Sequence, residues 1–208
     1  MNLYGRIFAA GYDRVFDAVE RAGLSDMRAG LLAFARGRTL ELGAGTGLNL
    51  RHYPADEIAL VLTEPEEPMV RRLERRVHDV RPGASVVRAS ADRLPFVDGS
   101  IDTVVSTLVL CTVPDQDVAL REIGRVLGAG GALLFLEHVR GDSPRVTRWQ
   151  DRLQPLWVHV GHGCHCNRDT LAAIRRAGFD VDTVEHTQLP NAPAFIRPLV
   201  IGRARASR

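Results

Sequence analysis

The fold of this chain is decided by the stretch Thr39-Leu40-Glu41-Leu42-Gly43-Ala44-Gly45-Thr46-Gly47, a short apolar run that leads into a glycine-rich turn. Closely spaced glycines let backbone amides approach a ligand that any Cβ would hold off. The next apolar run ends at Glu64, and a carboxylate at the end of a following strand accepts hydrogen bonds from a ribose diol. Together the turn and the acid predict a nucleoside-cofactor pocket at the start of an α/β domain.

The glycine spacing discriminates among nucleoside cofactors. A dinucleotide-binding loop reads Gly-x-Gly-x-x-Gly and places a pyrophosphate at a helix N-terminus. This chain instead has Gly43-x-Gly45-x-Gly47 after an acid at Glu41, and it contains no lysine for a Walker-type loop. The turn resembles motif I of the class I S-adenosylmethionine methyltransferases, whose cofactor carries no phosphate. The alternative is a turn that serves only as structural punctuation.

Later segments resemble the same family in its usual order. Residues 90–96 resemble the adenine-side segment, and residues 98–102 resemble the turn that follows it. Residues 104–110 resemble the fourth strand, which lines the cofactor and faces the substrate, and residues 125–134 resemble the helix, turn and fifth strand beyond it. Over residues 38–138 the chain therefore resembles a type 11 methyltransferase domain.

A closer resemblance extends toward the C-terminus. The chain is similar there to the methyltransferase-like thiol S-methyltransferases in residues 107–113, residues 135–139, Trp149, Trp157, Gly163-Cys164 and residues 197–202. This resemblance implies a small-molecule acceptor and a thiol before other classes. Those animal enzymes carry a membrane-anchoring N-terminal segment, which this chain is expected to lack. Phospholipid N-methyltransferases and other small-molecule N- or O-methyltransferases share parts of the pattern, and arsenite methyltransferases resemble the fold, so these acceptors stay open.

Length and composition are those of one globular domain. The 208 residues are 45% hydrophobic and 25% charged, with a formal net charge of +2, and this small charge argues against a nucleic-acid partner. No apolar run reaches the roughly 20 residues of a membrane span, and no secretory signal is visible. An odd number of cysteines, three, argues against a disulfide framework. We expect a cytoplasmic enzyme of undetermined oligomeric state.

Apolar runs that alternate with helical patterns predict a doubly wound, mostly parallel, Rossmann-like sheet of seven strands. Strands are expected at 38–42, 58–63, 84–88, 102–108 and 131–138, and helices at 47–53, 66–80, 115–128 and 168–178. Two further apolar runs, at 179–184 and 196–202, are expected to add an antiparallel hairpin with an antiparallel C-terminal edge strand. The single domain would comprise an N-terminal helical cap (1–37), the cofactor-binding core (38–138) and a substrate-side segment (139–208).

The family resemblance implies a set of cofactor contacts. The turn backbone would pack against the methionine part of S-adenosylmethionine, Glu41 would orient its ammonium group, and Glu64 would bind the ribose, unless Glu64 is only a charge at a helix N-terminus. Met69 would cover adenine, or belong to the core. The family's usual acid near the adenine is replaced by Ser90, so Asp92 or the Ala91 amide is expected there. The full set is Glu41, Gly43, Ala44, Gly45, Gly47, Asn49, Glu64, Met69, Ala91, Asp92, Thr107 and Leu108.

Methyl transfer is an in-line displacement that depends mainly on holding the reacting atoms in line without competing water. A thiol, with a pKa of about 8.5, is partly ionised at neutral pH, so the absence of an obvious base favours a soft nucleophile. His138 is the candidate to accept or orient a proton, and a hydrogen-bonded structural histidine is the alternative.

A patch rich in histidine and cysteine, residues 159–166, lies on the expected substrate side. Its Cys-x-Cys spacing is tighter than that of zinc sites, so we expect no metal. Trp149 and Trp157 would pack a lid or line an apolar pocket together with Leu108, Leu189 and Phe195. The substrate-pocket residues expected are Cys111, Trp149, Trp157, His162 and Cys164. A cofactor-binding module without catalysis is the rival from another functional class.

Overall fold

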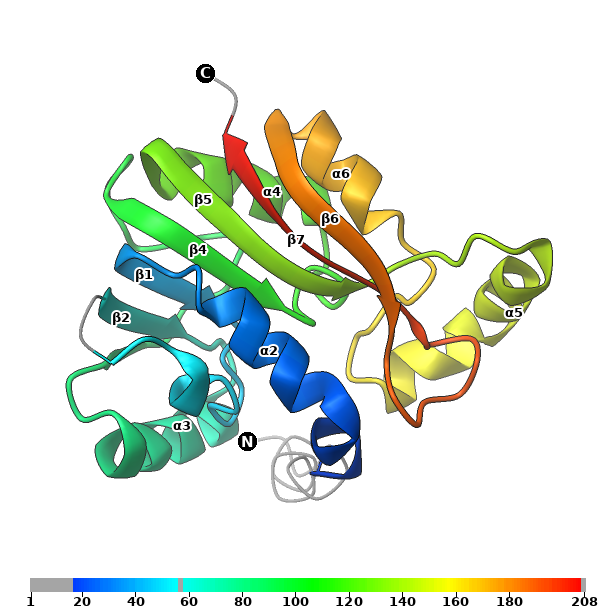
Figure 1. Cartoon of the computed structure of the whole chain (residues 1–208), viewed down its shortest axis with the longest axis horizontal. Helices are drawn as coiled ribbons and strands as arrows, with labels where there is room; N and C mark the ends of the chain where they lie inside the picture. The colour runs from blue at the N-terminus through cyan, green and yellow to red at the C-terminus, as the bar shows by residue number, and fades with distance from the viewer. Residues whose placement is uncertain (1–16, 56–57, 207–208) are drawn as a thin grey trace.

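The computed structural model, which describes residues 17–55 and 58–206, is built around one twisted sheet (Figure 1). Its strand order is β3-β2-β1-β4-β5-β7-β6. The strands are β1 (Gly37–Leu42), β2 (Ile58–Thr63), β3 (Ser85–Val87), β4 (Ile101–Thr107), β5 (Leu127–His138), β6 (Phe179–Gln188) and β7 (Pro198–Ala206). Strands β1 to β5 are parallel, and β7 is antiparallel to both β5 and β6. The predicted fold class is confirmed, with one refinement: β7 lies between β5 and β6, so β6 forms the edge.

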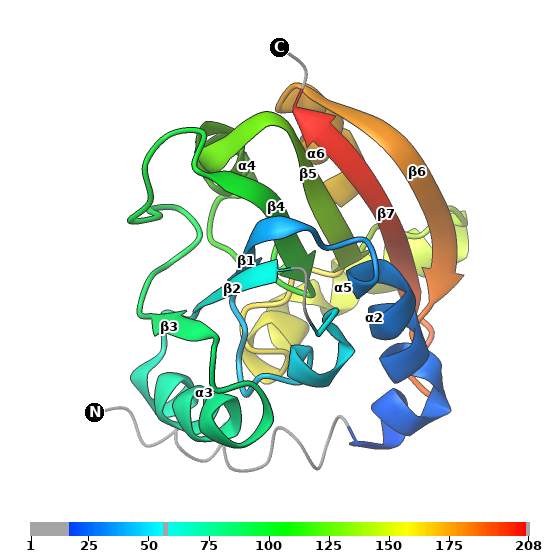
Figure 2. The same cartoon turned by 60° about the vertical axis from the view of Figure 1, so that its left-hand side comes forward.

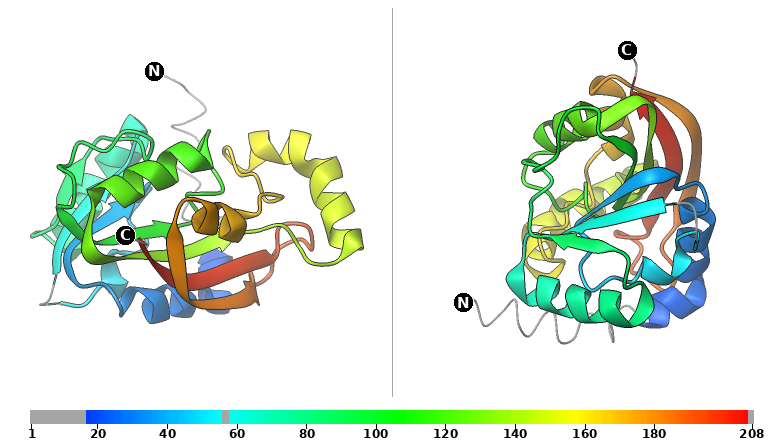
Figure 3. Two further views of the ribbon diagram at one scale, coloured as in Figure 1. Left: turned by 90° about the horizontal axis from the view of Figure 1, so that it is seen from above. Right: turned by 90° about the vertical axis from the view of Figure 1, so that its left-hand side faces the viewer.

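Helices cover both faces of this sheet (Figures 1 to 3). One hydrophobic cluster packs helices α4 and α6 against one face, and a second cluster packs α2 and α3 against the other. Helix α5 projects beyond the sheet, as Figure 1 and the left-hand view of Figure 3 show. The bounds are α2 (Ser25–Leu32), α3 (Glu67–Val80), α4 (Gln116–Val126), α5 (Pro144–Val160) and α6 (Thr170–Arg176).

The predicted N-terminal cap falls within the described residues only from residue 17 onward. There a π-helical turn, η1 (Glu20–Leu24), leads into α2. Gly23 has a φ of +131° inside this turn, a conformation open to glycine and costly for other residues. The kink places Glu20 and Arg28 side by side in the interior, where Arg28 Nε donates to Glu20 Oε1 at 3.0 Å.

The helix predicted over residues 47–53 was wrong. The chain forms successive turns after the glycine-rich segment and then a short 3-10 helix, η2 (Leu50–His52). Gly47 has a φ of +84°, which lies outside the right-handed helical region, and Pro54 follows soon after and cannot continue a helix. The residues between β1 and η2 therefore form a compact loop at the sheet edge.

The connection pattern creates a crevice where β1 and β4 lie side by side. From β1 the sheet grows outward to β2 and β3, whereas from β4 it grows in the opposite direction to β5. In open α/β sheets, ligands bind beyond the carboxyl ends of the strands at such a reversal of strand order. No helix within the described ranges is long and apolar enough to cross a membrane.

Candidate active site

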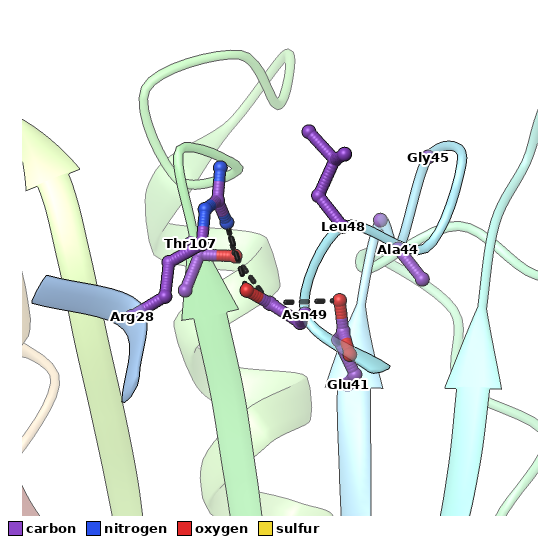
Figure 4. A pocket seen from close by; sticks show the side chains of 8 residues that line it. Arg28, Glu41, Ala44, Gly45, Leu48, Asn49 and Thr107 are labelled. Carbon is purple, nitrogen blue, oxygen red and sulfur yellow. Dashed lines mark hydrogen bonds between the residues drawn. The ribbon is translucent and has the colours of Figure 1, made fainter. Parts of the chain in front are cut away.

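A pocket opens where β1 and β4 end (Figure 4). Its cavity volume is about 20 Å³, room for about one water molecule and far below the roughly 300–1,000 Å³ typical of small-molecule sites, so in this structure the pocket is a narrow opening. Its walls come from α2, β1, the glycine-rich turn and the end of β4. The lining residues are Arg28, Glu41, Gly43, Ala44, Gly45, Leu48, Asn49 and Thr107.

Hydrogen bonds among buried side chains fix the floor of this pocket (Figure 4). Asn49 Nδ2 donates to Glu41 Oε1 at 2.9 Å and to Thr107 Oγ1 at 2.8 Å. Arg28 Nη1 donates to Asn49 Oδ1 at 2.8 Å and to Thr107 Oγ1 at 3.2 Å. Tyr53 donates its hydroxyl proton to Glu41 Oε2 at 2.7 Å. Four separate segments thus hold one cation and one carboxyl group at fixed positions.

The carboxyl group of Glu41 is in an unusual state. It is 2% exposed, and burial raises its pKa from 4.5 to about 7, although the hydrogen bonds from Tyr53 and Asn49 oppose the shift. Burial has this effect because a charged carboxylate loses its hydration in a poorly polar interior. A cation placed beside Glu41 would favour the ionised form, so the site is suited to an ammonium group.

The glycine-rich turn and Glu64 meet directly. The amide of Gly45 donates to Glu64 Oε2 at 2.9 Å, and the amide of Glu66 donates to Glu64 Oε1 at 2.9 Å. Gly43 has a φ of +50°, and a Cβ there would lie 2.9 Å from Val109 Cγ2, so a larger residue would be strained and crowded. Burial raises the pKa of Glu64. Its two fixed oxygens still have lone pairs available for further donors.

The remaining predicted cofactor residues lie outside the lining of this pocket. Met69 is buried in the first turn of α3, and Ala91 is also buried, whereas Asp92 is exposed. Gly47 packs close to the core, since a Cβ there would lie 2.8 Å from Leu50 Cδ1. Leu108 is half-buried just beyond β4, with a φ of +60°. Such a conformation is uncommon for a residue other than glycine and costs energy that the surrounding structure must offset.

The loop after β4 is held by a buried carboxylate that the sequence did not single out. Glu137 accepts hydrogen bonds from Ser106 Oγ at 2.6 Å and from the amides of Val109, Leu110 and Cys111 at 3.0, 3.0 and 3.1 Å. A carboxylate that satisfies several amides fixes the path of a loop that no secondary structure supports. Glu137 therefore fixes the segment that follows β4, which includes the predicted pocket residue Cys111.

His138 lies at the end of β5, as predicted, but in an apolar setting. Its side chain is buried, and burial lowers its pKa from 6.5 to about 4, while hydrogen bonding to the backbone of Pro198 and Ile196 offsets only part of the shift. Nδ1 has no hydrogen-bond partner among the described residues. At neutral pH this imidazole is uncharged and a weak base.

The structure brings together some of the predicted substrate-pocket residues. Cys111 and Cys164 are buried with their Sγ atoms 3.9 Å apart, and Trp157 packs edge-on against Phe195 with ring centroids 5.4 Å apart. These four residues belong to or pack against the same hydrophobic cluster. His162 Nε2 lies 2.8 Å from Glu66 Oε1, which links the loop after α5 to the segment that follows Glu64.

Trp149 lies apart from this cluster: it is 50% exposed on α5 and does not line the pocket. The metal interpretation of the patch at residues 159–166 also gains no support. In the part of the chain that the structure describes, no group of three or more His, Cys, Asp or Glu side chains is arranged to hold a metal ion.

The pocket also contains residues that sequence reasoning missed. Arg28 comes from the N-terminal region and reaches Thr107, 79 positions away in the sequence, and no local pattern signals that contact. Tyr53 and Leu48 follow the glycine-rich turn and resemble ordinary core residues. The burial of Arg28 is visible only in the structure, so the sequence offered no signal for it.

Known proteins are similar to this chain over most of its length. The family model "Methyltransferase domain" matches residues 40–135. The thiol S-methyltransferase TMT1A of Homo sapiens is 36% identical over 169 residues, which cover 79% of this chain and 69% of that protein. The thiol S-methyltransferase TMT1B of Rattus norvegicus is 34% identical with the same coverage.

A solved structure agrees with this fold. It is a methyltransferase dependent on S-adenosylmethionine from Thermotoga maritima, described as a possible histamine N-methyltransferase. It superposes with a TM-score of 0.71 at 24% identity and covers 96% of both chains. The pocket, the fold and these relatives lead to one assignment. The chain belongs to the S-adenosylmethionine-dependent methyltransferases, in the family that includes the thiol S-methyltransferases TMT1A and TMT1B.

Proposed function

We propose that this enzyme methylates a small thiol. The observation that carries the proposal is the 36% identity to a thiol S-methyltransferase over 169 residues. In the reaction, the thiol sulfur attacks the methyl carbon, the bond between that carbon and the sulfonium sulfur breaks, and its electron pair stays on the departing sulfur. The thiol proton is released to solvent, and the products are a methyl thioether and S-adenosylhomocysteine.

The residues that line the pocket suit the chemistry of the amino-acid end of the cofactor. S-adenosylmethionine supplies an electrophilic methyl group on a sulfonium centre. The Arg28 guanidinium would hold its carboxylate, because arginine pairs well with that group. Glu41 would hold its ammonium group together with Asn49, and Glu64 would accept hydrogen bonds from the ribose. These assignments are supported by the fixed spacing of one cation and one carboxyl group in the pocket floor.

The adenine would lie farther along the same crevice. Met69 in the first turn of α3 would cover one face of the base, and the amide of Ala91 would serve its edge. Asp92 is exposed, so we assign its carboxylate to the rim. Thr107 and Leu108 would face the methyl group, because β4 ends there beside the pocket.

A thiol acceptor is favoured because the predicted base at the end of β5, His138, is a weak base. The pKa of His138 is about 4, and Glu41 and Glu64 are assigned to the cofactor. A thiol needs little help, since a few per cent is ionised at neutral pH, whereas an alcohol would need a base. The chain's contribution is then to orient the reactants, which can supply on the order of 7–11 kcal/mol of the barrier.

The proposed acceptor site is apolar. Leu108, Trp157 and Phe195 pack beside Cys111 and Cys164 in one cluster, and such walls suit small thiols with apolar substituents. The loop that carries Cys111 is held by Glu137, so its position does not depend on a bound ligand. We also assign the enzyme to a reducing, cytoplasmic setting, on the support of three free, buried cysteines.

The test is an acceptor panel. The purified enzyme is incubated with S-adenosylmethionine carrying a labelled methyl group and with alkyl thiols, primary amines, phenols and arsenite. The proposal predicts labelled methyl thioethers with a preference for thiols. Methylation confined to amines or phenols would refute it. Binding of the cofactor without turnover would favour a non-catalytic module, and methylation of arsenite would favour the arsenite alternative, for which the paired thiols are the supporting observation.

One control addresses the protein's own thiols. Cys111 and Cys164 lie in the proposed acceptor site, so they are possible methyl acceptors themselves. Intact-mass measurement of the wild type and of Cys111→Ser/Cys164→Ser after incubation separates self-methylation from turnover. The double variant is expected to keep turnover of an added thiol, because neither sulfur takes part in the displacement.

A further inference from the structure

Helix α5 carries an apolar and cationic face that no other part of the described protein covers. Trp149, Leu156 and Val160 are 50%, 67% and 61% exposed. Residues three and four apart on a helix share a face, and Arg145, Trp149, Arg152, Leu156 and Val160 follow one another at spacings of four, three, four and four. We refer to these residues, with the flanking Arg148, as the outer face of α5.

The opposite side of α5 is firmly attached to the protein. Gln150 is fully buried, donates from Nε2 to the carbonyls of Val139 and Cys166 at 3.0 and 2.8 Å, and accepts from the amide of Gly141 at 2.9 Å. Trp157 packs against Phe195. The outer face is therefore presented by an anchored helix, and Figures 1 and 3 show α5 projecting from the body of the molecule.

The positive charge of the outer face is not neutralised by acidic side chains among the described residues. Arg145, Arg148 and Arg152 are exposed and form no ion pair with any residue in the described ranges. The acid on this helix, Asp151, is already paired with other residues. Arg140 donates hydrogen bonds to both of its carboxylate oxygens at 2.8 and 2.6 Å, and Asn167 donates to it at 3.0 Å. Three arginines thus remain beside an exposed tryptophan, leucine and valine.

We propose that the outer face of α5 docks the enzyme on an anionic lipid surface. A helix with arginines beside tryptophan and leucine lies in the plane of a membrane interface, with its apolar residues in the boundary between head groups and acyl chains. Trp149 suits that boundary, because its ring is apolar and its indole N–H is polar. Anionic head groups would supply the negative countercharge that Arg145, Arg148 and Arg152 lack among the described residues.

Docking through α5 does not depend on which acceptor the enzyme methylates, but it affects which acceptors come near the enzyme. Trp149 and Trp157 lie on one helix, the first facing outward and the second packed in the apolar cluster beside Cys164. A lipid surface at α5 would bring that cluster near the bilayer. Apolar small molecules dissolved in the membrane would then be close to the enzyme.

The test is vesicle co-sedimentation of the whole chain. The wild type is mixed with phosphatidylcholine vesicles and with vesicles that also contain phosphatidylglycerol. Binding is expected to the anionic vesicles, to weaken with salt, and to shift tryptophan emission to the blue. The triple variant Arg145→Gln/Arg148→Gln/Arg152→Gln should lose affinity by about fivefold per arginine, or on the order of a hundredfold. Leu156→Ser/Val160→Ser should weaken binding without changing net charge.

A matched control removes the same charge elsewhere. Arg75→Gln/Arg121→Gln/Arg175→Gln changes three exposed arginines on α3, α4 and α6 and should bind the vesicles almost as the wild type does. Circular dichroism and cofactor titration verify that each variant is folded. Equal binding to both vesicle types, equal loss in both triple variants, or no binding would overturn the proposal. Self-association that Leu156→Ser/Val160→Ser abolishes would overturn it too, by assigning the face to a second copy of the chain.

Discussion

We predict that the affinity for S-adenosylmethionine depends on pH through the ionisation of Glu41. Its pKa is about 7 in the free protein because the side chain is buried, and an ammonium group bound beside it would favour the ionised form. Between about pH 7.5 and about pH 6, the ionised fraction falls from about three quarters to about one tenth, so affinity should fall about eightfold, or about 1.3 kcal/mol. Binding near neutral pH should also release a fraction of a proton.

The assay is isothermal titration calorimetry with S-adenosylmethionine in buffers of different ionisation heat, which reports affinity and proton release together. Glu41→Gln is the matched variant, because the amide keeps the side chain's shape but does not titrate. It should bind more weakly at pH 7.5 and show a smaller change in affinity across the same range than the wild type. Glu64, whose pKa is also raised, remains in this variant, so the comparison isolates Glu41. A wild-type affinity that does not change from pH 7.5 to pH 6 would refute the assignment.

Three further predictions follow from buried groups. Arg28→Gln should lower the free energy of unfolding by about 3–5 kcal/mol, because it leaves the Glu20 carboxylate buried without its partner. In urea denaturation, adding Glu20→Gln should restore most of this loss, and a single variant as stable as the wild type would contradict the prediction. Glu137→Ala should lower the free energy of unfolding by at least about 3 kcal/mol, because three amides lose their acceptor. Urea denaturation measures this loss as well. His138→Asn should lower kcat by far less than the roughly 100-fold expected for loss of a general base and leave the pH profile of kcat unchanged; a 100-fold loss would restore His138 as the base.

The sheet and the cofactor loop were predictable because their signals are local. Apolar runs such as residues 58–63 are typical of strands buried between helices on both faces of a sheet. The closely spaced glycines before Glu64 mark a turn with backbone conformations that other residues rarely adopt. Gly45 and Glu64 were both assigned to one cofactor pocket, and a 2.9 Å hydrogen bond joins them in the structure. Local pattern and topology pointed to the same edge of the sheet.

The features that could not be predicted depend on contacts between distant segments or on exposed apolar residues. Arg28 reaches Asn49 and Thr107 only because the kink at Gly23 turns α2 toward the sheet. Helix α5 is hard to recognise in the sequence because Trp149, Leu156 and Val160 are exposed and Pro155 lies inside it, whereas pattern reasoning assumes that apolar residues face a core. The role of Glu137 depends on the three-dimensional path of a loop.

The central claim is that the crevice between β1 and β4 binds S-adenosylmethionine and that Glu64 holds its ribose. The most direct measurement is a calorimetric titration of the wild type and of Glu64→Ala with S-adenosylmethionine at neutral pH. We predict one binding site per chain in the wild type and an affinity lowered by about 10- to 100-fold in the variant, the expected loss for hydrogen bonds to a charged acceptor. No binding by the folded wild type, or equal affinities for the two proteins, would contradict the account.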